Sequence, residues 1–209
     1  MKCMGAENVA ERFGQTWENV KEEVMAGIGE RDVGIYCFWG ESASEITAPV
    51  MTAVINGRLA DAGSTAIARN FYLRDEVVLE EPETVREMFS HDVIFLDDFI
   101  TGGHRDRIRE RIRKGYKNLL DKLALSTITG MKSDEEMHTK AAGLELDYEK
   151  KHGEERYRDA VRHILDDAGL PVGELTDDPV HSLYGLPSVR YVAFQDGMIE
   201  DLQRPVPSR

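Results

Sequence analysis

The stretch Asp92-Val93-Ile94-Phe95-Leu96-Asp97-Asp98-Phe99-Ile100-Thr101-Gly102-Gly103-His104 decides the fold of this chain. Its apolar run has no alternation, which predicts a central strand buried on both faces. Two carboxylates follow side by side, and a glycine pair then lets the chain turn sharply and present its amide groups. A helix predicted from His104 would direct its positive N-terminal end toward the same place. This order of strand, acidic pair, glycine turn and helix is typical of a site for a phosphorylated ligand.

Strands and helices alternate on both sides of this stretch. The predicted helices cover 7–28, 45–62, 82–89, 104–122, 133–142 and 154–168, and the other predicted strands cover 33–39, 64–73, 123–128, 144–148 and 189–194. Such alternation indicates an α/β fold with a doubly wound, mainly parallel sheet flanked by helices. Ligands bind such sheets outside the carboxyl ends of the strands. We expect three loops to meet there, at 40–44, 69–83 and 97–104.

Length and composition suit one globular domain. The 209 residues are 41% hydrophobic and 31% charged, which is ordinary for a soluble protein. We expect an N-terminal helical segment over 1–32, an α/β ligand-binding domain over 33–200 and a flexible tail over 201–209. No apolar stretch reaches the ~20 residues that a membrane span needs, and no secretory signal is evident. Cys3 and Cys37 suit neither a disulfide framework nor a metal site. A cytoplasmic protein is therefore expected.

The distribution of charge bears on partners. A net charge of −13 argues against nucleic acid as the partner, because both would be polyanions. The predicted helix over 104–122 is locally basic, with Arg and Lys on every face except its apolar stripe. A solvated face is one interpretation of this helix, and a surface for a protein partner is the other. Association with further copies of the chain stays open.

The hydrophobic strand, the acidic pair Asp97-Asp98 and the glycine turn together resemble the phosphoribosyl-pyrophosphate motif of the type I phosphoribosyltransferases. The resemblance covers about 33–130, and its specific part is Ile94 to Gly103. It implies a phosphoribosyltransferase-like fold, a phosphorylated ribose or nucleotide as ligand, and Mg²⁺ as the cofactor. The chain departs from the family pattern at Gly102, where threonine is usual, and at Arg105, which follows His104 where a second small hydroxyl residue is usual.

The resemblance also implies roles for individual residues. Asp97 and Asp98 would bind the ribose hydroxyls and the metal, as the two catalytic acids. The ribose phosphate would lie in the turn that follows them, and pyrophosphate would lie in the loop after the first strand. Arg69 or Arg74 would belong to a segment that closes over the site. The residues implied in phosphate and pyrophosphate binding are Thr101, Gly102, Gly103, His104, Gly40, Glu41 and Ser42.

Two further resemblances concern other parts of the chain. Tyr184-Gly185-Leu186, followed by the strand at 189–194, is similar to divergent phosphoribosyltransferase-like domains of bacterial conflict systems, which implies a role in defence. A strand followed by Asp-Asp also resembles the Walker B element of helicase-loader ATPases. In that alternative, Gly40 to Thr47 stands in the place of the phosphate-binding loop, with Ile46 at the position of its lysine. The chain would then be a degenerate ATPase relative.

The residues leave open whether the chain is an enzyme. As a phosphoribosyltransferase it would substitute at the anomeric carbon, with pyrophosphate leaving, and this needs Mg²⁺ and oriented amides more than a strong base. As a nucleotide-sensing module it would bind the same ligand without turnover. A purely structural role for Asp97-Asp98, as caps of the following loop, is a third interpretation.

Overall fold

The computed structural model describes residues 6–26, 28–40, 43–98, 103–129, 166, 168–170, 188–194 and 196–202. The chain divides into two compact units. The first takes its described residues from 1–76, 91–107 and 188–202, and the second takes them from 77–90 and 108–187. The first unit holds the sheet, and both predicted acids lie in it.

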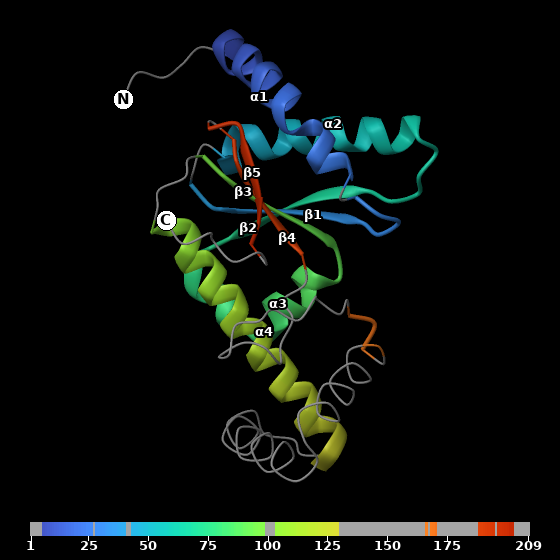
Figure 1. The fold of residues 1–209 in the computed structure, drawn as a ribbon, viewed down its shortest axis with the longest axis vertical. Coiled ribbons are helices and arrows are strands. Elements are labelled where there is room, and N and C mark those ends of the chain that lie inside the picture. The colour runs from blue at the N-terminus through green and yellow to red at the C-terminus, as the bar shows by residue number, and fades with distance from the viewer. Residues whose placement is uncertain are drawn as a thin grey trace. The chain divides into compact units, whose positions relative to one another are not determined.

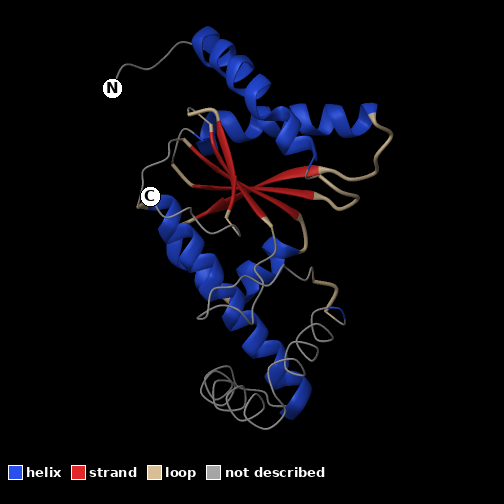
Figure 2. Ribbon diagram, viewed as in Figure 1, coloured by secondary structure: helices blue, strands red, loops and turns tan. Residues whose placement is uncertain are grey.

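The first unit is built on one five-stranded sheet (Figures 1 and 2). The strands, in the spatial order β2-β1-β3-β4-β5, are β2 (Ala68–Leu73), β1 (Val33–Phe38), β3 (Asp92–Asp97), β4 (Val189–Ala193) and β5 (Met198–Asp201). The first four run parallel, and β5 pairs with β4 in the antiparallel direction. The predicted α/β fold with a mainly parallel sheet is confirmed at this level.

The apolar runs predicted as strands form the centre of the sheet. All six residues of β1 are buried, and so are the last five of β3. Both strands have neighbours on two sides, which is the position where a continuous apolar run is stable. β2 lies at the edge, and four of its six residues are partly or fully exposed. The strand predicted over 64–73 began too early, because β2 starts at Ala68.

Helices α1 (Ala6–Ala26) and α2 (Ala48–Asp61) cover one face of the sheet (Figure 1). The helix predicted over 7–28 is confirmed, and one apolar stripe of it enters the core together with one stripe of α2. The residues that these helices contribute to the core are Phe13, Trp17, Val20, Val24, Ala48, Met51, Ile55 and Leu59. The N-terminal helix is therefore part of the same unit as the sheet. This packing fixes which side chains of each strand point toward α1 and α2.

Arg190 joins β4 to α1. Its guanidinium donates a hydrogen bond to the carbonyl oxygen of Val24, and the residue is only 8% exposed. Burial lowers the pKa of Arg190, and the nearby carboxylates of Asp92 and Asp201 raise it in part. A buried guanidinium between these groups holds the strand and the helix together through a charge-assisted hydrogen bond.

The opposite face of the sheet is aromatic. Tyr36 stacks on Phe71 with ring centroids 4.7 Å apart, and Phe95 stacks on Tyr191 at 6.1 Å. Phe38 meets Phe95 edge to face at 5.4 Å. Offset and edge-to-face pairs of this kind stabilise a core beyond the apolar area they bury. The face toward α1 and α2 is mainly aliphatic, so the two faces of the sheet differ in chemistry.

The second unit contains α3 (Pro82–Phe89), most of the 3₁₀ segment η2 (Glu76–Glu80) and the greater part of α4 (His104–Thr129). Phe89 meets Tyr116 of α4 edge to face at 5.1 Å, and burial raises the pKa of the Tyr116 phenol. Glu80 pairs with Lys114 and Arg111. The hydrogen bond from Lys114 lowers the pKa of the Glu80 carboxyl.

Several sequence-derived elements need correction. The strand predicted at 123–128 is wrong, because α4 continues through it to Thr129. β5 was not predicted at all. The elements predicted at 133–142, at 144–148 and, but for two residues, at 154–168 lie outside the described residues, as does most of the predicted tail. Within the described residues, none of the helices combines the length and the apolar character needed to cross a membrane.

Candidate functional site

The order of the strands points to one edge of the sheet. From β1 the chain crosses to β2 on one side, and then returns to β3 on the other side of β1. Ligands of open parallel sheets bind at the carboxyl ends of the strands, where the direction of the crossovers reverses. Here that place is the edge between β1 and β3. The loops after these two strands are the same loops that the sequence assigned to pyrophosphate and phosphate.

The two central strands part at this edge. The β1–β3 pairing runs from Val33–Asp92 to Tyr36–Phe95. Beyond it, Phe38 pairs with Leu73 of β2, and Asp97 pairs with Ala193 of β4. The carboxyl ends of β1 and β3 therefore turn to different neighbours, and the acidic pair emerges where they separate.

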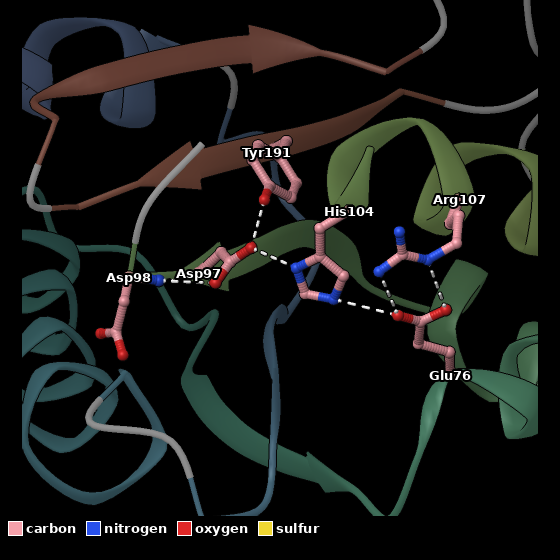
Figure 3. A network of polar contacts seen from close by, with 6 residues as sticks. All are labelled: Glu76, Asp97, Asp98, His104, Arg107 and Tyr191. Carbon is pink, nitrogen blue, oxygen red and sulfur yellow. Dashed lines mark hydrogen bonds and ion pairs between the residues drawn. The ribbon is translucent and has the colours of Figure 1, made fainter. Parts of the chain in front are cut away.

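Asp97 is buried in a network of hydrogen bonds (Figure 3). One carboxylate oxygen accepts from the backbone N–H of Asp98 at 2.7 Å. The other faces Nδ1 of His104 at 2.8 Å and accepts from the Tyr191 hydroxyl. Asp97 is 5% exposed. A buried carboxylate with several donors is well stabilised, and it has little capacity left to bind a ligand. The structure thus places Asp97 beneath the edge of the sheet.

The network continues from His104 to Glu76 and Arg107. Nε2 of His104 lies 3.2 Å from Glu76 Oε1, and Arg107 donates to both oxygens of Glu76 at 3.2 and 3.3 Å. Each ring nitrogen of His104 thus faces a carboxylate oxygen, Nδ1 that of Asp97 and Nε2 that of Glu76. This arrangement ties the first turn of α4 to the end of β3 and to the start of η2.

Asp98 points the other way. Side chains alternate between the faces of a strand, and Ile94 and Leu96 belong to the core beneath α1 and α2. Asp98 continues their side, whereas Asp97 faces His104 and Tyr191. Figure 3 shows the Asp98 carboxylate directed away from the network. The structure therefore separates the two predicted acids, which were expected to act on one ligand together.

The glycine turn is described only at its end. Thr101 and Gly102 lie outside the described residues. Gly103 is exposed, and its carbonyl oxygen accepts the first helical hydrogen bond of α4 from the N–H of Arg107, at 3.2 Å. The N–H groups of this first turn precede the intrahelical ladder and suit an anion. The ring of His104 is engaged in the network, so its predicted contact with phosphate would fall to its backbone N–H.

The loop after β1 leads directly into a helix. Gly40 has a φ of +84°, a conformation that glycine adopts without strain, and Glu41 and Ser42 lie outside the described residues. The chain then forms the π-helical turn η1 (Ala43–Thr47) ahead of α2. Both interpretations of this loop, pyrophosphate loop and degenerate ATPase loop, require this position between a strand and a helix.

The two predicted arginines lie apart. Arg69 pairs with Gly34 near the start of both strands, and its guanidinium is 4.0 Å from Asp32. That is the amino end of the sheet, so the structure does not bring Arg69 to the predicted site. Arg74 follows β2 at the carboxyl end and forms an ion pair with Asp75 at 3.0 Å. The loop predicted at 69–83 therefore begins at Arg74.

The basic face of α4 is largely matched by carboxylates. Within the first unit Arg105 pairs with Glu200, and within the second unit the cations pair mainly with acids of η2, α3 and α4 itself. These second-unit pairs are Arg111–Glu80, Lys114–Glu80, Arg113–Glu110 and Lys122–Glu83. The side chains of Arg105 and Arg113 are only 15% and 13% exposed, so the basic face is solvated only in part. The protein-partner surface over 104–122 stays a prediction.

The described side chains offer few donors for the predicted magnesium site. In the described part of the chain, no group of three or more His, Cys, Asp and Glu side chains is arranged to hold a metal. The oxygens of Asp97 are taken up by donors. Mg²⁺ is commonly held by one or two carboxylates together with phosphate oxygens of the ligand. Asp98 fits that arrangement, and Asp97 does not.

Sequence reasoning missed Glu76 and Tyr191 as members of this network. Tyr191 is 94 positions from Asp97 in the chain, and nothing local connects them. The sequence did contain a signal that Asp97 and Asp98 would point in opposite directions, because strand alternation alone sends consecutive residues to opposite faces. Comparison of the chain with protein-family models, with curated proteins and with solved structures found no significant match.

Proposed function

We propose that the carboxyl edge between β1 and β3 binds a phosphorylated ribose, such as phosphoribosyl pyrophosphate or a related nucleotide. The observation that carries the proposal is the strand order, which places the acid-bearing end of β3 beside β1 at the crossover reversal. Open parallel sheets bind nucleotides at this place. The resemblance of Ile94 to Gly103 to the phosphoribosyl-pyrophosphate motif supports the same ligand.

Each part of the ligand has a suitable partner at this edge. Asp98 would accept hydrogen bonds from the ribose hydroxyls, because an ionised carboxylate is an acceptor with two oxygens. The first-turn N–H groups of α4, from Gly103 onward, would receive the ribose phosphate. The loop that begins at Gly40 would receive pyrophosphate. Asp97 supports this edge from below through His104 and Tyr191.

With a bound donor the chain would catalyse phosphoribosyl transfer. The bond between the anomeric carbon and pyrophosphate would break, a bond from that carbon to a nitrogen of the base would form, and the proton of that nitrogen would pass to the leaving pyrophosphate. Mg²⁺ would neutralise the leaving pyrophosphate. Oriented amides and Asp98 would hold the sugar in place, and such electrostatic stabilisation requires no strong base. The engagement of both His104 nitrogens agrees with a reaction that uses no histidine base.

The first test concerns Asp98. Asp98→Asn is expected to weaken the binding of phosphoribosyl pyrophosphate at least tenfold, because the amide removes a charge and one acceptor from the ribose contact. Calorimetric titration measures the affinity, and release of pyrophosphate in the presence of bases measures turnover. Asp61→Asn is the matched control, since Asp61 is an exposed carboxylate at the end of α2. Equal affinity of the Asp98 variant and the wild type would contradict the proposal.

The second test concerns the metal. The wild type is expected to bind phosphoribosyl pyrophosphate more tightly with Mg²⁺ than with a chelator present, because Asp98 would hold the ion and the ion would neutralise charge on the pyrophosphate. Ribose 5-phosphate has no pyrophosphate, and its affinity should change much less. Titrations of both ligands with and without Mg²⁺ measure the difference. Equal affinities for the pyrophosphate ligand would argue against this mode of binding.

A nucleotide-sensing module is the second candidate, and the burial of Asp97 favours it. With Asp97 taken into the network, Asp98 is the one of the two predicted acids that would contact sugar and metal. In that case phosphoribosyl pyrophosphate would bind without release of pyrophosphate by any base. The network would then pass the state of the edge to α4, since His104 begins that helix.

A further inference from the structure

Two aromatic side chains lie exposed at the same edge of the sheet. Trp39, directly after β1, is 72% exposed, and Tyr72 of β2 is 41% exposed. Their rings meet edge to face, with centroids 5.4 Å apart and an interplanar angle of 85°. The other tryptophan, Trp17, is 6% exposed in the core. Trp39 thus presents most of a large apolar ring to solvent, where its burial would be favourable.

The positions of these rings follow from strand pairing. The N–H of Trp39 donates to the carbonyl oxygen of Leu73 at 2.9 Å, so Trp39 continues β1 beside the end of β2. Cys37 faces the core beneath α1 and α2, and alternation puts Trp39 on the same side. Tyr72 likewise follows Ala68, which belongs to that core. Both rings therefore lie on the carboxyl edge, toward the α1 and α2 face.

Asp98 lies on this same side of the sheet. It follows Leu96 by two residues, and Leu96 belongs to the same core. The rings and the carboxylate thus stand at the ends of β2, β1 and β3, which are consecutive neighbours in the sheet. The carboxyl ends of β1 and β3 diverge beyond Tyr36 and Phe95, so a ligand that contacts both Trp39 and Asp98 would span the opening between these two strand ends.

We propose that Trp39 and Tyr72 form a platform for the planar heteroaromatic ring of the ligand, while Asp98 holds its ribose. This inference rests on the function proposed above and extends it to the base. Two perpendicular rings offer a base the face of one ring for stacking, and the other ring limits the stacking area on one side. Stacking accepts any nucleobase, because every base has a π-face. The ligand class is therefore a nucleotide or its base, and sugar phosphates alone would use only part of the site.

Binding of ligands with and without a base tests the platform. Trp39→Ala is expected to weaken the binding of nucleoside 5′-monophosphates about tenfold. This loss lies in the lower part of the range for base–aromatic stacking. The probes are the monophosphates of adenine, guanine, cytosine and uracil nucleosides. Ribose 5-phosphate, which has no base, should lose less than twofold. Trp39→Phe should retain most of the nucleotide affinity because it keeps a ring.

Ile67→Ala is the matched control. Ile67 is an apolar residue 40% exposed, and it precedes β2 at the amino end of the sheet. Its replacement should leave the affinities for nucleotides and for ribose 5-phosphate unchanged. Of the two tryptophans only Trp39 is exposed, so acrylamide should quench the fluorescence of Trp39. In the wild type, nucleotides should quench this same fluorescence, and ribose 5-phosphate should not.

The outcomes separate the two proposals. If the wild type binds both nucleotides and ribose 5-phosphate, and the Trp39→Ala variant binds nucleotides as tightly as the wild type does, the platform is overturned and the ribose site stands. Equal weakening of nucleotides and ribose 5-phosphate would also overturn it, because the loss would then concern the shape of the edge. If the wild type binds neither ribose 5-phosphate nor phosphoribosyl pyrophosphate nor any nucleotide, the proposed function fails, and the platform fails with it.

Discussion

Replacement of Asp97 by Asn is expected to lower the free energy of unfolding by about 3 kcal/mol, because it removes a charge and one of the two acceptor oxygens from a buried network. One oxygen of Asp97 faces His104 and Tyr191, and the other faces the N–H of Asp98. An asparagine keeps the shape of the side chain but can offer oxygen to only one of these sides. If the NH₂ group faces the N–H of Asp98, two donors meet. If it faces His104 and Tyr191 instead, those groups must accept a hydrogen bond where Asp97 had accepted from the Tyr191 hydroxyl.

Urea unfolding of Asp97→Asn and wild type measures this difference. Asp61→Asn serves as the control, since a surface change of the same chemistry is expected to stay within about 0.5 kcal/mol. Tyr191→Phe, combined with Asp97→Asn in a double-mutant cycle, should show coupling, because both changes act on one hydrogen bond. A loss below about 1 kcal/mol for Asp97→Asn would contradict the network. Asp97 would then be free to serve as a ligand residue.

Gly115→Ala is expected to lower the free energy of unfolding by about 2 kcal/mol, although alanine is the better helix former. A Cβ at Gly115 would lie 2.0 Å from the carbonyl oxygen of Leu79 and 2.6 Å from Val85 Cγ2. Overpacking of this kind costs about 1–3 kcal/mol and sometimes more, and the backbone carbonyl of Leu79 has little room to move. The gain in helix propensity offsets about 1 kcal/mol.

Gly57→Ala is the matched control for this prediction. Gly57 also lies inside a helix, α2, but no atom comes within 4 Å of the position of its Cβ. The same substitution there should raise the free energy of unfolding by about 0.5–1 kcal/mol. Opposite signs for the two variants in urea unfolding would confirm that close packing sets the effect at Gly115. A stabilising Gly115→Ala would contradict the packing of α4 on η2.

The contrast between Asp97 and Asp98 bears directly on function. Adjacent acids at the end of a strand look like one chemical unit in a sequence. In the sheet they divide, because alternation sends one toward His104 and the other toward the α1 and α2 face. Loss of Asp97 should therefore act mainly on stability, and loss of Asp98 mainly on ligand affinity. The proposed ligand contacts accordingly rest on Asp98.

The errors in the sequence-derived elements have local reasons. The run at 123–128 has the apolar and β-branched residues of a short strand. It is helical because no glycine or proline interrupts α4 between Gly115 and Gly130, and Leu123 continues the helical stripe of Leu119 and Leu120. The hairpin from β4 to β5 turns at Gly197, with a φ of +62°. Its Asp-Gly pair is a recognised hairpin signal and would have revealed β5.

The sequence by itself determined the parallel core of this protein and the place of the acidic pair at the end of β3. Apolar runs and helical periods are local patterns, and they follow from the burial that each element needs. Only the tertiary structure decided that Asp97 would be buried against Tyr191 and His104, that Arg69 would lie at the amino end, and that Trp39 would stand exposed beside Tyr72. These outcomes depend on which strands become neighbours and in what register. Pairing between distant segments is a property of the whole packed sheet, so no local stretch of sequence contains it.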